Sequence, residues 1–409
     1  MKCRFCGREI KETVIDLVNA PPSNAYLREE QLNDSEIYYP LKIMVCEHCW
    51  LVQVDEYASS ADIFDDDYLY FSSYSSSWVE HARKYVEMII PRLSLSSNSK
   101  VMEIASNDGY LLQFFVKSQI PCVGVEPSTS TIQEAAEKGV ESIPEFFGTQ
   151  LAKWIVDTRG KQNLIIGNNV LAHVPDINDF VEGLQISLAR DGTITMEFPH
   201  LLNLLKYVQF DTIYHEHYSY LSLLSVQQIF SAHGLKIYDV EELPTHGGSL
   251  RIYACHKSDD KPISSSVPSV LQSEIDYGLN TLDVYVTFRK QVENIRNDFL
   301  EFLIRLKKEK KCVVGYGAAA KGNTLFNYCG IKGNQMIYAV ADASPHKQGR
   351  YLPGSHIPII SPEAIKNIKP DYLIIIPWNI KQEIMNQNAY IREWGGKFVT
   401  IIPRIEISE

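Results

Sequence analysis

The sequence predicts an α/β protein in which a small cysteine-rich module precedes two α/β units. Two Cys-x-x-Cys pairs bracket a short segment near the N-terminus, and short apolar strands alternate with helical stretches between residues 101 and 200. A second strand–turn–helix pattern begins at Cys312. Because strands that alternate with helices usually pair in parallel, each of the two later units is expected to contain a parallel sheet.

Length and composition agree with this fold class and exclude several functions. The 409 residues give room for two or three domains of roughly 100–200 residues each. Hydrophobic residues make up 45% of the chain and charged residues 22%, as in an ordinary globular protein. The net charge of −11 argues against a nucleic-acid-binding surface, which needs clustered lysine and arginine. No apolar run approaches the ~20 residues that span a bilayer, and the N-terminus lacks the apolar core of a secretory signal, so we expect a cytoplasmic protein without membrane contact.

Residues 1–62 are predicted to form a zinc-binding module. Cys3 and Cys6 form one Cys-x-x-Cys pair, and Cys46 and Cys49 form the other. A single pair would also be compatible with a redox-active dithiol, but two pairs favour one tetrahedral zinc ion with four thiolate ligands. Four cysteine ligands leave no open coordination position, so the metal is expected to be structural.

The first α/β unit is expected between residues 63 and 256. It should begin with an acidic and aromatic loop and an amphipathic helix near 77–90. Its strands are expected in the apolar segments "KVMEI", "CVGVE", "NLIIGNN" and "GTITMEF". The helix "SLLSVQQIFSA" should stop at Gly234, and "LKIYDVEEL" and "SLRIYACH" should form two adjacent strands joined by "PTHGG".

The second α/β unit is expected to span residues 271–409. Residues 257–270 are polar and rich in serine and proline, which indicates a linker. Residues 271–309 are predicted to form one long amphipathic helix that leads into the unit. The strands are then expected in "CVVGY", "MIYAVAD" and "PDYLIII".

The turn after the first strand of the first unit, residues 103–109, lacks the spaced glycines of a dinucleotide fingerprint, which disfavours pyrophosphate binding there. Glu103 lies at the end of this strand, and Glu126 closes the next strand. Carboxylates at these places can accept hydrogen bonds from an amine and from ribose hydroxyls, although a strand-terminal glutamate is often only a helix cap or a solvated group. The pattern looks like that of class I S-adenosylmethionine (SAM) methyltransferases, with Glu103 in the first motif and Glu126 as the ribose-binding acid.

The segment "YHEHYSY", residues 214–220, gathers two histidines, a glutamate and three tyrosines. An unperturbed histidine titrates near pH ~6.5, so proton transfer at neutral pH is one interpretation. A metal site and a packed polar loop are the other two interpretations. His215 is expected to pair with the adjacent Glu216, and Tyr218 and Tyr220 are expected to be packing residues or part of the cofactor wall.

Further segments follow in a fixed order: the two Cys-x-x-Cys pairs, "YLYFSSYSSSW", "EIASNDGYLL", "GVEPS", "NNVLAHVPD", "YHEHYSYLS", "THGGSLR" and "GYGAAAKGN". In this order they closely resemble the sugar-nucleotide C-methyltransferases, of which the 3-C-methyltransferase of tetronitrose biosynthesis is an example. The resemblance covers nearly the whole chain, and "YHEHYSYLS" with "GYGAAAKGN" is highly specific. It implies a zinc-binding module, a class I SAM-methyltransferase Rossmann-like domain and a second Rossmann-like α/β domain.

The resemblance implies an enzyme that methylates the carbon beside the ketone, expected to be C-3, of a nucleoside-diphosphate 4-keto-deoxyhexose in deoxysugar biosynthesis. That carbon is nucleophilic only as an enolate, so a base is needed, and His217 is the expected general base. Tyr214 and Glu216 would orient this base or stabilise the enolate oxygen, and His173 and Tyr68 would close the site. A metal bound to the histidines is the weaker interpretation, because methyl transfer from a sulfonium needs none. The residues expected to bind SAM are Glu103, Ser106, Asn107, Gly109, Glu126, Asn168 and Asn169.

The second α/β domain is implied to bind the sugar nucleotide. Its glycine-rich turn lets a backbone approach phosphates, Lys321 adds a positive charge, and Asp342 closes the next strand as a ribose-binding acid would. The residues expected to bind the substrate are His246, Gly247, Gly248, Arg251, Gly317, Lys321 and Asn323. The active site would then lie in a cleft between the two α/β domains of a monomer or weak oligomer. The same turn leaves an NAD-dependent sugar-nucleotide oxidoreductase as an alternative, and the four cysteines leave a non-enzymatic adaptor.

Overall fold

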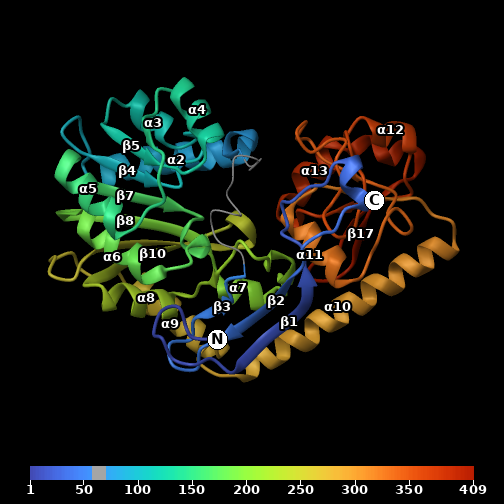
Figure 1. The fold of residues 1–409 in the computed structure, drawn as a ribbon, viewed down its shortest axis with the longest axis horizontal. Helices are drawn as coiled ribbons and strands as arrows, with labels where there is room; N and C mark the ends of the chain where they lie inside the picture. The colour runs from blue at the N-terminus through green and yellow to red at the C-terminus, as the bar shows by residue number, and fades with distance from the viewer. Residues whose placement is uncertain (58–70) are drawn as a thin grey trace.

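Figure 1 shows a computed structural model of the protein, which describes residues 1–57 and 71–409. The two α/β units lie side by side, and the strands β1 (Glu12–Ala20) and β2 (Tyr39–Val45) and the long helix α10 (Asp283–Lys308) run along one side of them. The described strands form three sheets, one for the N-terminal module and one for each α/β unit.

The N-terminal sheet is antiparallel and has the order β1-β2-β3-β9. Three of its strands come from the cysteine-rich module: β1 (Glu12–Ala20), β2 (Tyr39–Val45) and β3 (Val52–Val54). The fourth, β9 (Ser219–Tyr220), comes from the "YHEHYSY" segment and pairs with β3. The module therefore holds the histidine-rich segment as the edge strand of its own sheet.

The first α/β unit contains a seven-stranded sheet of order β10-β11-β8-β7-β4-β5-β6. The five strands from β8 to β6 are parallel, whereas β11 is antiparallel to both β8 and β10. The strands are β4 (Val101–Ile104), β5 (Cys122–Val125), β6 (Ser142–Ile143), β7 (Gln162–Asn168), β8 (Leu188–Pro199), β10 (Leu235–Leu243) and β11 (Ser249–His256). The helices are α2 (Ser76–Arg92), α3 (Leu112–Lys117), α4 (Thr129–Glu137), α5 (Thr149–Arg159), α6 (Ile177–Ser187), α7 (Leu201–Lys206) and α8 (Leu223–Ala232). The expected α/β unit with a parallel sheet is thereby confirmed, and two strands, β11 and β10, extend it.

The second α/β unit contains a six-stranded sheet of order β14-β13-β12-β15-β16-β17, parallel except for the last pair. The strands are β12 (Val313–Tyr316), β13 (Val340–Ala341), β14 (Ile359–Ile360), β15 (Tyr372–Ile375), β16 (Lys397–Thr400) and β17 (Glu406–Ser408). The helices are α11 (Ala320–Tyr328), α12 (Ala364–Ile368) and α13 (Lys381–Gln387). The buried, apolar strands β12 and β15 lie at its centre, as expected for a parallel sheet.

The expected single helix over residues 271–309 is wrong. The structure has two helices there, α9 (Ser266–Tyr277) and α10 (Asp283–Lys308). Gly278 ends α9 with φ of 96° in the left-handed region, a conformation that glycine adopts without steric cost. Since α9 begins at Ser266, it also takes up the end of the expected linker, and the expected domain boundary at residue 271 lies inside it.

A shared hydrophobic core joins the module to the second α/β unit. The cluster includes Val14 and Leu17 of β1, Tyr218 of the histidine-rich segment, Phe299 of α10 and Phe326 of α11. Three of the four cysteines belong instead to a core with the first unit's sheet. The module is thus packed against both α/β units. No helix in the described part of the chain has the length and apolar character that crossing a membrane requires.

Candidate active site and metal centre

The four cysteines of the module come together as expected. Their sulfur atoms all lie within 4.8 Å of one another, with 3.5 Å between Cys3 and Cys49 and 3.6 Å between Cys6 and Cys46. These separations are too long for disulfides, whose sulfurs are about 2.05 Å apart. A tetrahedral zinc ion with Zn–S distances of about 2.3 Å needs sulfurs about 3.8 Å apart. The side chains therefore fit a structural zinc ion.

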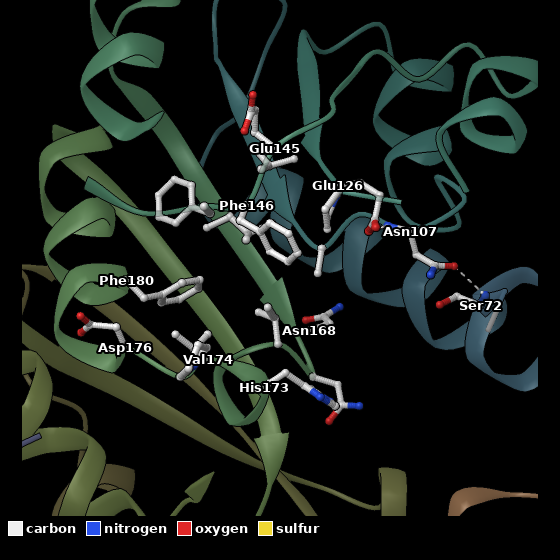
Figure 2. A pocket seen from close by; sticks show the side chains of 18 of the residues that line it. Ser72, Asn107, Glu126, Glu145, Phe146, Asn168, His173, Val174, Asp176 and Phe180 are labelled. Carbon is white, nitrogen blue, oxygen red and sulfur yellow. Dashed lines mark hydrogen bonds between the residues drawn. The ribbon is translucent and has the colours of Figure 1, made fainter. Parts of the chain in front are cut away.

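A cavity of about 380 Å³ lies at the carboxyl ends of β4, β5 and β7. Figure 2 shows Glu126, Asn107 and Asn168 around it, with Phe146 and Phe180 across from them. Ligands of α/β sheets bind at this end of the strands, and the volume is in the range of cofactor sites. The cavity is therefore the candidate cofactor site.

Glu126 is held at the cavity by two backbone donors. The N–H of Asn107 donates to Oε2 and the N–H of Ser128 donates to Oε1, both at 3.0 Å. Burial raises the pKa of Glu126, and these hydrogen bonds oppose the rise. Each carboxyl oxygen keeps a second lone pair, so the group can still accept hydrogen bonds from vicinal hydroxyls. The side chain of Asn107 in turn accepts from the N–H of Ser72 at 2.9 Å, which closes this side of the cavity (Figure 2).

Asn168 ends β7 and Asn169 follows it, and both line the cavity. Both amide atoms of Asn168 and the Oδ1 of Asn169 are buried, with no hydrogen-bond partner among the residues that the structure describes. Unpaired buried amides are costly, so these atoms are positioned for a ligand's polar groups. Together with Glu126 they make the cavity fit SAM.

Three of the expected SAM-binding residues do not line the cavity. Glu103 is fully buried, and burial raises its pKa well above the usual value although a hydrogen bond from Tyr110 opposes this. Ser106 packs under β5, where its hydroxyl leaves no room for a side chain at Gly124. Gly109 faces Ala135 of α4. Ser106 and Gly109 therefore pack behind the cavity wall, and Glu103 is buried beneath it.

Sequence reasoning missed the aromatic walls of the cavity. They are formed by Trp78, Tyr110, Phe146, Phe147 and Phe180. In the sequence these residues look like any other core aromatic, because nothing in a helix or strand pattern distinguishes a side chain that faces a cavity. The acidic residues Glu145, Asp176 and Asp179 also line the cavity and carried no motif.

His217 lies against the cavity residue His173, with ring centroids 4.7 Å apart. Its Nδ1 lies 2.9 Å from the carbonyl oxygen of Thr212, so this nitrogen carries the proton and donates it. Its Nε2 is buried and has no hydrogen-bond partner in the described residues. Burial lowers the pKa of His217 well below 6.5, and burial lowers that of His173 to about 4, so both rings are neutral. The ring of Tyr214 lies over His217 at 4.1 Å.

This geometry depends on the N-terminal module. Tyr218 accepts a hydrogen bond on its carbonyl from the N–H of Val54 at 3.1 Å, next to the pairing of β3 with β9. Within the segment, the N–H of His217 closes a turn on the carbonyl of Tyr214 at 3.0 Å. Tyr68, which was expected to close the site, lies outside the described residues.

The expected pairing of His215 with Glu216 is wrong. The Nε2 of His215 lies 3.2 Å from the carbonyl of Pro40, and its ring packs against Tyr39. The Glu216 carboxyl accepts instead from the side chain of Asn24 at 2.7 Å. Burial raises the pKa of Glu216 to about 7. The hydrogen-bond partner that orients the His217 ring is thus not Glu216 but the backbone carbonyl of Thr212.

The glycine-rich turn of the second unit is closely packed. Gly317 has φ of 91°, and a Cβ there would lie 2.6 Å from Pro377, so both conformation and space require glycine. The carboxylate of Asp342 accepts from the N–H groups of Ala318 and Ser344 at 2.7 and 2.8 Å. Asn323 donates its side chain to the carbonyl of Ser23. These residues fix the turn to its own sheet and to the module.

Lys321 lies between the two α/β units. Its Nζ donates to the side chain of Asn379 at 2.9 Å and lies 4.2 Å from the ring centroid of Trp378. The indole N–H of Trp378 donates to Asp211 of the first unit at 2.8 Å. Burial raises the pKa of Asp211 to about 6, and the charge of Lys321 opposes that rise. A positive charge is thus held beside the histidine-rich segment.

The loop "THGG" comes to the same junction. His246 lines the cavity and packs edge-on against Trp78 at 4.9 Å, and burial lowers its pKa to about 4. Gly247 contacts Trp378 and Gly248 contacts Asn203 so closely that a side chain at either would collide.

Arg251, also expected to bind the substrate, lies outside the cavity lining. It is buried, and it donates to Glu197 at 2.8 Å and to Glu241 at 3.1 Å. These two carboxylates occupy its guanidinium, so the structure does not place Arg251 with the other expected residues.

Comparisons with known proteins identify the family. Family models match a putative zinc binding domain at residues 3–64, a methyltransferase domain at 78–240 and a C-methyltransferase C-terminal domain at 244–403. The C-methyltransferase NovU of Streptomyces niveus is 35% identical over 402 residues, which are 98% of this chain and 95% of that protein.

Solved structures similar to this chain are more distant in sequence. Magnesium protoporphyrin IX methyltransferase of Synechocystis PCC 6803 with bound SAH is 17% identical, with a TM-score of 0.34 over 44% of this chain and 84% of that one. The PH0226 protein of Pyrococcus horikoshii OT3 is 15% identical, with a TM-score of 0.37 over 46% and 95%. TM-scores of this size carry no conclusion about the site. The full-length similarity to NovU shows the family, and it removes the support for an oxidoreductase or an adaptor. The chain belongs to the C-methyltransferase family and is a SAM-dependent C-methyltransferase with an N-terminal zinc-binding domain.

Proposed function

We propose that the enzyme methylates the carbon beside the ketone, at C-3, of a nucleoside-diphosphate 4-keto-deoxyhexose. The observation that carries this proposal is the neutral His217, whose Nε2 is buried and unpaired while Thr212 holds the proton on Nδ1. A carbon beside a ketone reacts as a nucleophile only after it loses a proton. A fixed imidazole lone pair next to the cofactor cavity is the group that removes it.

A second group has to stabilise the oxygen of the enolate. A histidine whose pKa is far below 6.5 is a weak base, so proton removal needs hydrogen-bond donors aimed at the developing negative charge. Glu216, with a pKa of about 7, is partly protonated at neutral pH and can donate. Tyr214, whose ring packs tilted against that of His217, has a hydroxyl of the right chemistry. His173 completes the wall between the base and the cavity.

SAM supplies the methyl group together with its own leaving group, so no step requires the zinc ion. In this proposal Glu126 binds the ribose hydroxyls, and Asn168 and Asn169 bind the polar part of the cofactor through their unpaired amides. Phe146 and Trp78 cover apolar surface and exclude water.

The nucleoside diphosphate is assigned to the junction between the two α/β units. Lys321 supplies the positive charge there, and Gly247 and Trp378 bring the first and second units into contact. The support comes from the resemblance to sugar-nucleotide C-methyltransferases and from the half-buried position of this lysine at the junction between the two units.

A panel of nucleotide-linked ketosugars tests the proposal. Each sugar is incubated with SAM, and mass spectrometry follows the gain of one methyl group, whose position NMR then locates. We expect methylation of a 4-keto-deoxyhexose at C-3. Methylation of oxygen or nitrogen only, or of compounds without a ketone, would contradict the proposal.

Replacing Glu126 with alanine is expected to weaken SAM binding strongly. Hydrogen bonds to a charged group contribute about 1.5–3 kcal/mol each, so losing those to the ribose should raise the Kd at least tenfold. Isothermal titration calorimetry measures the Kd. Glu126→Gln, which keeps the shape, separates loss of charge from loosening of the turn, and Glu137→Ala at the exposed end of α4 is the matched control. An unchanged Kd in both Glu126 variants would exclude this role.

Lys321→Ala is expected to raise the KM for the sugar nucleotide and to leave the Kd for SAM unchanged. A cation that meets the diphosphate acts equally in the ground state and the transition state, so kcat should change little. Steady-state kinetics with varied sugar nucleotide measures this, and Lys307→Ala on the exposed side of α10 serves as the control. If SAM affinity fell instead, the roles assigned to the two α/β units would have to be exchanged.

A further inference from the structure

The carboxyl group of Glu216 has a hydrogen-bond partner from a distant part of the chain. Asn24, on the loop of the zinc module that follows β1, donates its side-chain amide to Oε1 of Glu216 at 2.7 Å. Glu216 is only 4% exposed. The contact exists because the module is packed against the histidine-rich segment, and no sequence motif includes Asn24.

The loop that carries Asn24 is fixed to the second α/β unit. The hydroxyl of Tyr26 donates to the carbonyl of Ala318 at 2.6 Å and lies 3.3 Å from Oδ1 of Asn24. The carbonyl of Ser23 accepts from the side chain of Asn323. Ala318 belongs to the glycine-rich turn and Asn323 to α11, so Asn24 is held on a loop with defined contacts on both sides of it.

We propose that Asn24 is a positioning residue of the active site, which fixes Glu216 as a hydrogen-bond donor to the oxygen that becomes negative during methyl transfer. A neutral carboxyl group carries its proton on one of two oxygens. Because the N–H of Asn24 occupies Oε1, the proton is directed to Oε2. Thr212 acts on His217 in the same manner, since its carbonyl holds one proton and leaves the other nitrogen free. The inference rests on the proposed function for the identity of the substrate.

The surroundings of Glu216 set the pH range in which it can donate. Burial raises its pKa to about 7, and the hydrogen bond from Asn24 and the charge of Lys347 oppose that rise. The protonated fraction, and with it the donor, therefore falls as pH rises through about 7. The other titratable groups of the packed elements are Tyr26, Asp342, Lys347 and the neutral His173 and His217.

Two variants test the role of Asn24. Asn24→Ala removes the side chain, and Asn24→Asp keeps its shape without the donor. Both should lower kcat about ten- to a hundredfold, the effect of losing one oriented hydrogen bond to an ionisable group. Both should also move the decline of kcat at high pH to higher pH, because the interaction that lowers the pKa of Glu216 is gone. Asn19→Ala, at an exposed asparagine of β1, should change neither quantity, and SAM affinity should be unchanged in all three.

Infrared spectroscopy gives a readout that needs no substrate. The carboxyl band of protonated Glu216 is identified as the band missing in Glu216→Gln, and its pH midpoint should rise in Asn24→Ala. A midpoint that rises while no ketosugar is methylated would leave the positioning role intact and reject only the proposed substrate. A midpoint equal to that of the wild type in both Asn24 variants would overturn the positioning role, whether or not kcat falls, because Asn24 would then only support the fold.

Discussion

Replacing His217 with alanine is expected to reduce methyl transfer by a factor of about 10²–10⁴, the contribution of a positioned general base. SAM and the sugar nucleotide should still bind, because a base acts on the transition state and not on ground-state binding. Single-turnover assays and calorimetry measure the two effects separately. His256→Ala, at a histidine whose Nε2 lies 3.2 Å from the carbonyl oxygen of Leu188, is the control.

Hydrogen exchange distinguishes His217 from its neighbour. In deuterated water, with a SAM analogue that cannot transfer a methyl group, the wild type should exchange the hydrogen on the carbon beside the ketone. The exchange should vanish in His217→Ala and persist in part in Glu216→Gln, because the carboxyl assists the enolate but does not take the proton. If His217→Ala kept near-normal turnover while His173→Ala lost it, His173 would be the base and "YHEHYSY" would be a substrate-positioning loop.

Loss of the zinc site is expected to unfold the N-terminal module. Structural zinc contributes about 10–16 kcal/mol in small zinc domains. Cys46→Ser with Cys49→Ser should therefore remove the metal and unfold the two Cys-x-x-Cys turns that bind it. Metal analysis and thermal unfolding measure the two effects. Cys122→Ser with Cys312→Ser, at cysteines outside the cluster, is the matched control. Zinc retained by the Cys46→Ser, Cys49→Ser variant, or an unfolding temperature of this variant equal to that of the control, would contradict the assignment.

The contacts of the Cys3–Cys6 turn predict that the folding of the module is lost before methyl transfer. Arg4, between the first two cysteines, donates to the carbonyl of Pro175 at 2.7 Å and to that of Val54 at 2.5 Å. The side chain of Asn178 donates to the carbonyls of Arg4 and Phe5. The N–H of Val54 donates to the carbonyl of Tyr218, so two successive hydrogen bonds connect the Cys3–Cys6 turn to the histidine-rich segment. Folding of the module should fail first, and methyl transfer should then decrease because His217 is no longer held.

Local chemistry allowed several features to be predicted from the sequence. The four zinc ligands could be predicted because each short Cys-x-x-Cys turn presents two sulfurs to one ion, independently of the rest of the fold. The strands Leu235–Leu243 and Ser249–His256 were expected at the same residues at which they occur, because apolar alternation ends at proline and glycine. Glu126 was identifiable as a cavity residue because the end of a parallel strand lies at the ligand-binding edge of the sheet.

Tertiary packing alone decided how these residues act. Asn24 meets Glu216 because the module packs against the histidine-rich segment, where β9 joins the sheet of the module, and contacts between residues so distant in sequence leave no local pattern. Arg251 was expected to bind the substrate, but burial beside Glu197 requires the two charges to neutralise each other, and only the fold brings them together. The sequence thus determined which chemical groups the protein has and which elements carry them. Their protonation, orientation and partners depend on burial and on long-range contacts, which exist only once the three parts of the chain pack together.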